Sequence, residues 1–389
     1  DEHEIDAVPV QHPRKTRVVG RQHCQFAAGS LGCSQRRDGP GLGPPVIIEI
    51  AHPTTVVGGP PPDPLTCGAD GRHTLSPVAL PVCKPSWLRP ILVANVVAEV
   101  LIIVTGGIVR LTGSGLGCPD WPTCAQGSLT PVAAQDEGFH KFIEFGNRTL
   151  TGVLIVIAVL ALWAVWTALP KRRMLHRLGI AMIVGIFVEA VVGGITVWTG
   201  LNPVIVAFHF LATIVLVAIA TAMLRGAQDG NEVDTGSRTL LVPTITARLA
   251  WVTYAVGFLV LALGTIVTGS GPHSGDADAP ARTGFDPRTM SWIHADVVML
   301  FIGLLVAMLV AVRLARVGGS QVSGSEEELA LLRRSWTSVL HVSLLQGVVG
   351  YVQFFTGLPI IVVLTHMLLA AVLAIALTYG TLNLYRNPV

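Results

Sequence analysis

Long apolar runs dominate this chain from about residue 88 onward. A helix needs roughly 20 apolar residues to cross the hydrocarbon core of a bilayer, where lipid cannot satisfy exposed backbone groups. Eight segments meet that requirement. The pattern therefore predicts an all-α polytopic membrane protein with transmembrane helices at 88–111, 140–168, 175–198, 204–224, 248–268, 290–314, 335–355 and 360–380.

Composition and charge support this prediction. The chain has 51% hydrophobic and 13% charged residues, and its mean hydropathy of +0.62 is well above that of a soluble domain. Basic residues gather after the second, fourth and sixth spans, so the positive-inside rule predicts that both termini are cytoplasmic. The net charge of +2 gives no support to nucleic-acid binding. The basic residues concerned are Lys171, Arg172, Arg173, Arg177, Arg225, Arg238, Arg248, Arg313, Arg316, Arg333 and Arg334, against Arg282 and Arg288 in the opposite loops.

Residues 1–86 differ from the rest of the chain. They contain 13 of the 25 prolines, frequent glycine and no apolar run of spanning length. This composition predicts a disordered cytoplasmic extension. Its cysteines lack a paired C-x-x-C spacing, so we expect reduced, unpaired thiols and not a metal site. They are Cys24, Cys33, Cys67 and Cys83.

An internal repeat organises the remainder. The segment VVGGITVWTGLNPVIVAFHFLAT at 191–213 aligns without a gap with VVGYVQFFTGLPIIVVLTHMLLA at 348–370. His209 thereby falls on His366, and Glu189 falls on Gln346. Looser matches align the other helices, so that Asn147 corresponds to His294. The repeat predicts two tandem pseudo-symmetric four-helix bundles, at 87–228 and 248–389, joined by a cytoplasmic linker at 229–247.

Three histidines lie within the predicted spans. His209, His294 and His366 fall near the outward ends of their helices, and ionisable residues in a membrane span mark functional sites by default. Neutral imidazoles on facing helices are typical axial ligands of haem iron. The second bundle offers the pair His294 and His366 for a haem cofactor, whereas the first offers His209 with Asn147, whose amide is a poor iron ligand.

Charged residues surround the corresponding position in the first bundle. His140, Glu144 and Asn147 are spaced to share one helix face, so Glu144 is expected to point toward the cofactor edge. We expect it to transfer a proton or stabilise a cation. Arg110 and Arg148 suit either haem propionates or lipid headgroups. Glu99 and Glu189 are compatible with a structural role and with a functional one.

The first outward loop reads TGSGLGCPDWPTC. A disulfide between Cys118 and Cys124 is plausible on the oxidising face, and two thiolates alone would leave a metal under-coordinated. The GSGLG run lacks the full dinucleotide-binding pattern and follows a membrane helix, which argues against such a site.

The string GGIVRLTGSGLGCPDWPTC at 106–124, the IEFGNR stretch and the two TGL-to-histidine segments resemble the haem A synthase family over about residues 87–385. The resemblance implies oxidation of the ring C8 methyl of haem O to a formyl group, with water as the oxygen source. It implies substrate haem in the first bundle and haem b in the second. It matches Glu144 to the glutamate that precedes the family's first haem histidine. It also matches Cys118 and Cys124 to the family's outer-loop cysteine pair, and His209, His294 and His366 to its remaining haem histidines.

One departure from the family pattern concerns the first haem histidine. The family's E-x-x-H-R reads Glu144-Phe145-Gly146-Asn147-Arg148 here, which predicts weaker iron ligation in the substrate bundle. The resemblance also implies a plasma-membrane location, haem O supplied by haem O synthase and haem A consumed by an aa3-type oxidase. The sequence does not identify the electron acceptor. A homo-oligomer is compatible with the sequence but is not required by it.

Two alternatives remain open from the sequence. A dihaem b-type electron-transfer protein would use the same histidines, but it would not need the two bundles to differ. A transporter would also use tandem repeats and buried charges, and it would contain no haem.

Overall fold

The apolar runs fold as α-helices in the computed structural model, which describes residues 23–27, 30–34, 81–133, 135–231, 239–276, 280–317 and 324–386. Within these residues, eight helices are long and apolar enough to cross a membrane, which confirms the predicted all-α membrane architecture. They are α1 (Pro85–Leu111), α2 (His140–Ala168), α3 (Arg173–Trp198), α4 (Pro203–Ala227), α5 (Thr244–Ser270), α6 (Pro287–Val317), α7 (Glu326–Phe355) and α8 (Ile360–Leu382).

The largest difference from the predicted spans is at the start of α7. This helix begins nine residues before the predicted residue 335, because Ser325 caps it. The Ser325 hydroxyl accepts the Glu328 amide hydrogen, and the Glu328 carboxylate accepts that of Ser325, which forms a capping box. The stretch is too polar for an apolar-run criterion to include it.

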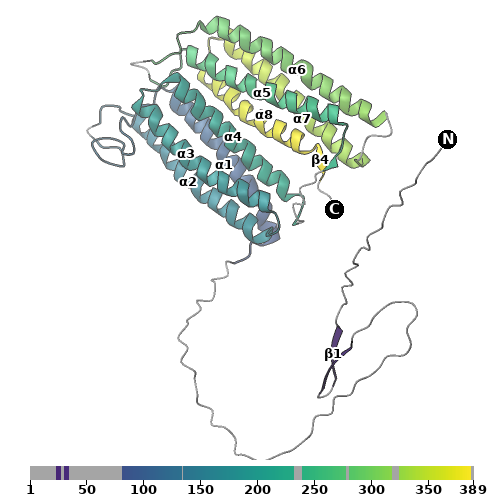
Figure 1. Ribbon diagram of the computed structural model, residues 1–389. Helices are drawn as coiled ribbons and strands as arrows, with labels where there is room; N and C mark the ends of the chain where they lie inside the picture. The colour runs from purple at the N-terminus through teal and green to yellow at the C-terminus, as the bar shows by residue number, and fades with distance from the viewer. Residues whose placement is uncertain are drawn as a thin grey trace, which may run out of the picture. The chain divides into compact units, whose positions relative to one another are not determined.

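The helices form two four-helix bundles that lie side by side (Figure 1). In the first bundle α1 contacts α2 and α4, and α3 contacts α2 and α4. In the second bundle α5 contacts α6 and α8, and α7 contacts α6 and α8, which is the same order of neighbours. Helices α1 and α4 of the first bundle pack against α8 of the second, and α4 also contacts α5.

Small and branched apolar side chains fill the seam between the bundles. Ile103 of α1 and Ile214 of α4 pack with Leu261 of α5 and with Ala370 and Ala374 of α8. Alanines let the helix backbones approach closely, as is typical of helix packing in membranes. Large apolar side chains on the outside of the bundles remain exposed, as expected for surfaces that face lipid; they include Val156, Phe187, Met299 and Val348.

The repeated TGL sequence forms the same turn in both bundles. Gly200 and Leu201 follow α3 with φ of 57° and 59°, and Gly357 and Leu358 follow α7 with φ of 78° and 61°. The amide of Leu201 donates to the carbonyl of Thr196 at 2.8 Å, and that of Leu358 donates to Gln353 at 2.8 Å. A left-handed leucine costs free energy, so its presence in both copies indicates a shared local geometry.

The chain divides into two units, Asp1–Thr74 and Leu75–Val389. In the first unit, β1 (His23–Ala27) and β2 (Ser30–Ser34) pair antiparallel and place Cys24 opposite Cys33. This hairpin differs from the prediction of a wholly unstructured extension; the rest of residues 1–80 lies outside the described residues. In the second unit, β3 (Thr239–Leu240) pairs with β4 (Tyr385–Arg386), so the linker after α4 contacts the segment after α8. Cys83 is a free, buried thiol, as predicted.

Candidate functional site

One face of α2 contacts the end of α1 and the loop that follows it. This face carries the three residues that the sequence placed together, and each has a polar partner across the gap between the helices. The predicted shared face is therefore confirmed, although its side chains meet α1 and the loop. The contacts are His140 Nδ1 with Ser114 Oγ at 2.8 Å, Glu144 Oε2 with the Cys118 amide at 2.7 Å, and Asn147 Oδ1 with Thr105 Oγ1 at 2.7 Å.

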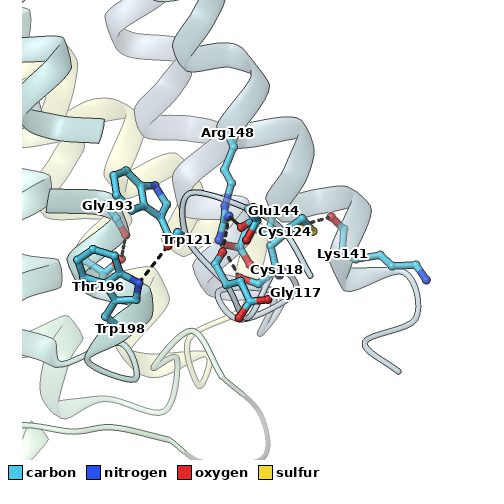
Figure 2. Close-up of polar contacts among 12 residues, drawn as sticks. Gly117, Cys118, Trp121, Cys124, Lys141, Glu144, Arg148, Gly193, Thr196 and Trp198 are labelled. Carbon is cyan, nitrogen blue, oxygen red and sulfur yellow. Dashed lines mark hydrogen bonds and ion pairs between the residues drawn. A yellow bond between two sulfur atoms is a disulfide. The ribbon is translucent and has the colours of Figure 1, made fainter. Parts of the chain in front are cut away.

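Arg148 clamps the α1–α2 loop, residues 112–139, onto α2 (Figure 2). Its Nε and Nη2 donate to Oε1 of Glu144 at 3.0 and 2.5 Å. Its Nη2 also donates to the carbonyl of Cys118 at 2.8 Å, and its Nη1 donates to those of Asp120 and Thr123 at 2.8 and 2.9 Å. Its guanidinium therefore hydrogen-bonds both the loop and Glu144.

The loop held by Arg148 is closed by a disulfide. Cys118 and Cys124 are bonded, as the sequence suggested. Between them, the ring of Trp121 lies on Gly194 of α3, where any added Cβ would overlap it. Trp198 donates its indole hydrogen to the Trp121 carbonyl at 3.2 Å, and the two rings meet edge to face at 5.3 Å. The disulfide loop thus covers one end of the first bundle by contacting both α2 and α3.

A second set of contacts fixes the start of α2 beneath the loop. Buried Lys141 donates through Nζ to the carbonyls of Val132 and Gln135 at 2.9 and 3.3 Å. The Gln135 amide donates to the carbonyl of Gly117. A Cβ at Gly117 would overlap the carbonyl of His140, so only glycine lets the loop lie this close to the helix. Sequence reasoning missed these residues because their role depends on the loop conformation.

Arg110 joins the two bundles. Its Nε donates to the carbonyl of His273 at 2.9 Å, and its Nη2 approaches that of Thr268 at 3.4 Å. The His273 ring in turn hydrogen-bonds the carbonyl of Leu358 through Nε2 at 3.0 Å. Arg110 is thus directed toward the end of α5 and the α5–α6 loop of the second bundle, and its role toward a propionate stays a prediction.

The three candidate iron ligands each face a glycine on a neighbouring helix. An added Cβ would lie 3.3–3.5 Å from the imidazole, so each glycine lets the neighbouring helix pack directly against the ring. His294 and His366 are close enough to interact electrostatically, and their rings have the backbones of Val260 and Gln346, respectively, as hydrogen-bonding neighbours. Partly buried imidazoles on neighbouring helices fit haem iron. The pairs are His209 with Gly193, His294 with Gly264 and His366 with Gly350.

The first bundle differs from the second in two respects. Asn147, at the position that corresponds to His294, accepts a hydrogen bond from Thr105 on α1. His209 has a carboxylate partner, because its Nδ1 lies 2.7 Å from Oε2 of Glu189. The described residues contain no cluster of three or more histidine, cysteine, aspartate or glutamate side chains arranged to bind a metal ion directly.

Two four-helix membrane bundles with partly buried histidines set against glycines define a class of polytopic membrane protein that suits haem. A model of the COX15-CtaA family, described as cytochrome oxidase assembly proteins, matches residues 89–378. The chain belongs to this family.

Three relatives show how far the similarity extends. The chain is 27% identical to the "Heme A synthase" of Lysinibacillus sphaericus (strain C3-41) over 317 residues, which are 77% of this chain and 96% of the relative. It is 26% identical to that of Alkalihalophilus pseudofirmus over 307 residues, 75% of this chain and 95% of the relative. A "Heme A synthase" of Listeria welshimeri is 31% identical over 134 residues, 33% of this chain and 43% of the relative.

Proposed function

We propose that this protein is a haem A synthase, a membrane oxidoreductase that converts the ring C8 methyl of haem O into the formyl group of haem A. Family membership and the near full-length similarity to proteins of that name support the proposal. In this reaction the methyl carbon gains an oxygen atom from water and loses electrons and protons. The acceptor of those electrons is a separate molecule.

The observation that carries the proposal is the position of Glu144. Its carboxylate is buried, and it pairs with the Arg148 guanidinium and accepts the Cys118 amide hydrogen. A buried charge is expensive unless it is paired and hydrogen-bonded, and both conditions are met here. A preorganised anion favours positive charge that develops on the carbon being oxidised, and it can accept the proton released there. We assign Glu144 this catalytic role.

The first bundle binds the substrate haem O in this proposal. His209 of α4 would bind the iron, and Asn147, which stands where the second bundle has His294, would be a poor iron ligand. Weaker ligation suits a substrate that must enter and leave. Arg148 acts through Glu144 and the loop, and Arg110 holds the neighbouring loop of the second bundle.

The second bundle holds haem b in this proposal. His294 and His366 would bind the iron, and their electrostatic proximity supports that assignment. Gly264 and Gly350 pack against the two rings. When bound, haem b would supply one-electron transfer.

Membrane orientation and partners complete the proposal. The distribution of basic residues supports cytoplasmic termini, with the Cys118–Cys124 loop on the oxidising face of the plasma membrane. The identical TGL turns support a pseudo-symmetric pair of bundles. Haem O comes from haem O synthase through the membrane lipid, and haem A passes to an aa3-type oxidase.

Substitution of Glu144 by glutamine tests the catalytic assignment. The amide keeps the shape but removes the negative charge and the proton acceptor. We expect haem A formation to fall by about a hundredfold or more, with haem content unchanged. Asp136→Asn, an exposed change in the same loop, is the matched control and should keep wild-type activity. Wild-type activity in Glu144→Gln would remove Glu144 from the mechanism.

A further inference from the structure

A buried carboxylate accompanies the candidate iron ligand of the first bundle. Glu189 of α3 lies in the bundle interior, and its Oε2 is 2.7 Å from Nδ1 of His209 on α4. Thr213, one turn further along α4, donates its hydroxyl hydrogen to the same oxygen at 2.9 Å. Nδ1 lies within hydrogen-bonding distance of the oxygen, although the ring N–H is not aligned with it.

The second bundle lacks both partners at the equivalent positions. Gln346 replaces Glu189, and Ala370 replaces Thr213 in the gap-free alignment that matches His366 to His209. The Gln346 amide donates to the backbone carbonyl of His366 at 3.0 Å and not to its ring. The His366 ring has the neutral backbone of Gln346 as its hydrogen-bonding neighbour, where the His209 ring has the Glu189 carboxylate. The two bundles therefore surround equivalent histidines with different chemistry.

This difference affects the nitrogen that faces iron. A carboxylate that accepts the hydrogen of Nδ1 fixes the tautomer with Nε2 free, and it raises the electron-donating strength of the ring. In His209 the Nε2 atom faces Gly193 of α3, where an added Cβ would lie 3.5 Å from it. A neutral amide bonded to the backbone has no such effect. A stronger donor stabilises ferric iron relative to ferrous iron, and so lowers the midpoint potential of the bound haem.

We propose that Glu189, oriented by Thr213, is a positioning residue that makes His209 a stronger iron ligand than its counterpart His366, so that the two haem sites are unequal. The inference rests on the proposed binding of haem by both bundles. It extends that proposal by assigning a role to Glu189 and by giving a reason for its replacement in the second repeat. Glu99 of α1 is close enough to Glu189 to interact electrostatically with it, and it belongs to the first bundle.

A redox titration of the full-length, haem-loaded protein tests the inference. Wild-type protein should show two haem components. Glu189→Gln should raise the midpoint potential of the first-bundle component, and a tenfold change in its ferric-to-ferrous ratio corresponds to about 59 mV for one electron. The same variant should lower the iron–histidine stretching frequency of that haem. Its affinity for added haem should fall by about tenfold or more.

Two further variants separate positioning from folding. Thr213→Val keeps the carboxylate and removes the hydroxyl that orients it. It should therefore raise the midpoint potential of the first-bundle haem, but by less than Glu189→Gln does. Gln346→Ala removes the counterpart residue in the second bundle and should leave the midpoint potential of the first-bundle haem unchanged. Together these variants keep the test informative if Glu189→Gln binds too little haem for a titration.

The outcomes distinguish this inference from the proposed function. Unchanged potential and stretching frequency in Glu189→Gln would overturn the role of Glu189, while haem A formation by the same protein would leave the proposed function standing. Equal shifts in the midpoint potentials of both haems would also overturn the role of Glu189, because a general structural change would then be the cause. A wild-type chain that takes up no haem in either bundle would overturn both.

Discussion

The guanidinium of Arg148 and the carboxylate of Glu144 form an ion pair at 2.5 Å, one helical turn apart on α2. The same guanidinium donates to three carbonyls of the disulfide loop, so a single side chain joins the candidate catalytic carboxylate to the loop above it. Loop conformation and the position of the Glu144 carboxylate are therefore coupled. Changes in one should be detectable in the other.

Substitution of Arg148 by lysine tests this coupling. Lysine keeps the positive charge but cannot reproduce the planar fork of donors, so most loop contacts should be lost. We expect faster proteolysis in residues 117–125 and at least about tenfold lower haem A formation. Haem bound through His294 and His366 should be retained. If the loop stayed as resistant as in wild type, the clamp described for Arg148 would be wrong.

The disulfide should matter for the same reason. Replacement of Cys118 and Cys124 by alanine opens the loop whose backbone amide donates to Glu144. We expect reduced haem A formation, and the backbone amide at position 118 should exchange its hydrogen faster in the double variant than in wild type. Cys83→Ala removes a thiol outside the site and is the control. Burial raises the pKa of the Cys83 thiol, so it should also react slowly with alkylating reagents.

Gly117 provides a test of close backbone packing. Gly117→Ala places a methyl group against the carbonyl of His140, and overpacking of this kind costs about 1–3 kcal/mol of unfolding free energy. Gly146→Ala is the matched control, since its Cβ would meet open space within α2. That change should stabilise the helix by about 0.5–1 kcal/mol. Thermal unfolding in detergent measures the stability of both variants. We expect Gly117→Ala to lower the unfolding temperature and Gly146→Ala to raise it.

The beginning of α6 should respond to acid. Oδ2 of Asp286 accepts the hydroxyl and amide hydrogens of Thr289, each at 2.7 Å, and these bonds lower the pKa of Asp286. A lowered pKa means that the stabilisation is present above the ordinary aspartate pKa of about 3.9 and is lost as the pH falls through the folded value.

Hydrogen exchange of the Thr289 amide measures this cap. After correction for the intrinsic pH dependence, protection should decrease on the acid side in wild type. Asp286→Asn keeps an acceptor without a titrating carboxyl, so its protection should stay constant with pH. Asp286→Ala should lack the protection throughout. A pH-independent wild type would show that the carboxylate does not cap α6.

The membrane spans could be predicted because each depends on a local run of apolar residues. The α2 bounds agree with the prediction, whereas α7 begins earlier because a polar capping box extends it beyond the apolar stretch. The repeat alignment also identified Glu189 and Gln346 as counterparts. The structure adds that these two side chains have different partners, the ring of His209 and the backbone of His366.

The partners of the arginines could not be predicted. The sequence places Arg110 and Arg148 near the ends of apolar runs, and that position alone is compatible with propionates, lipid headgroups or backbone carbonyls. Their partners depend on the folded paths of two loops, which are set by the Cys118–Cys124 bond and by contacts such as Trp121 on Gly194. Such contacts join residues far apart in sequence and have no periodic signal.

The most direct test of the account is a comparison of the haems extracted from membranes that make haem O, with and without this chain. The protein should be present, folded and haem-loaded in the test membranes. The account predicts that haem O decreases and haem A appears only when the chain is present. Haem O that stays at the level of the membranes lacking the chain, with no haem A formed, would contradict it.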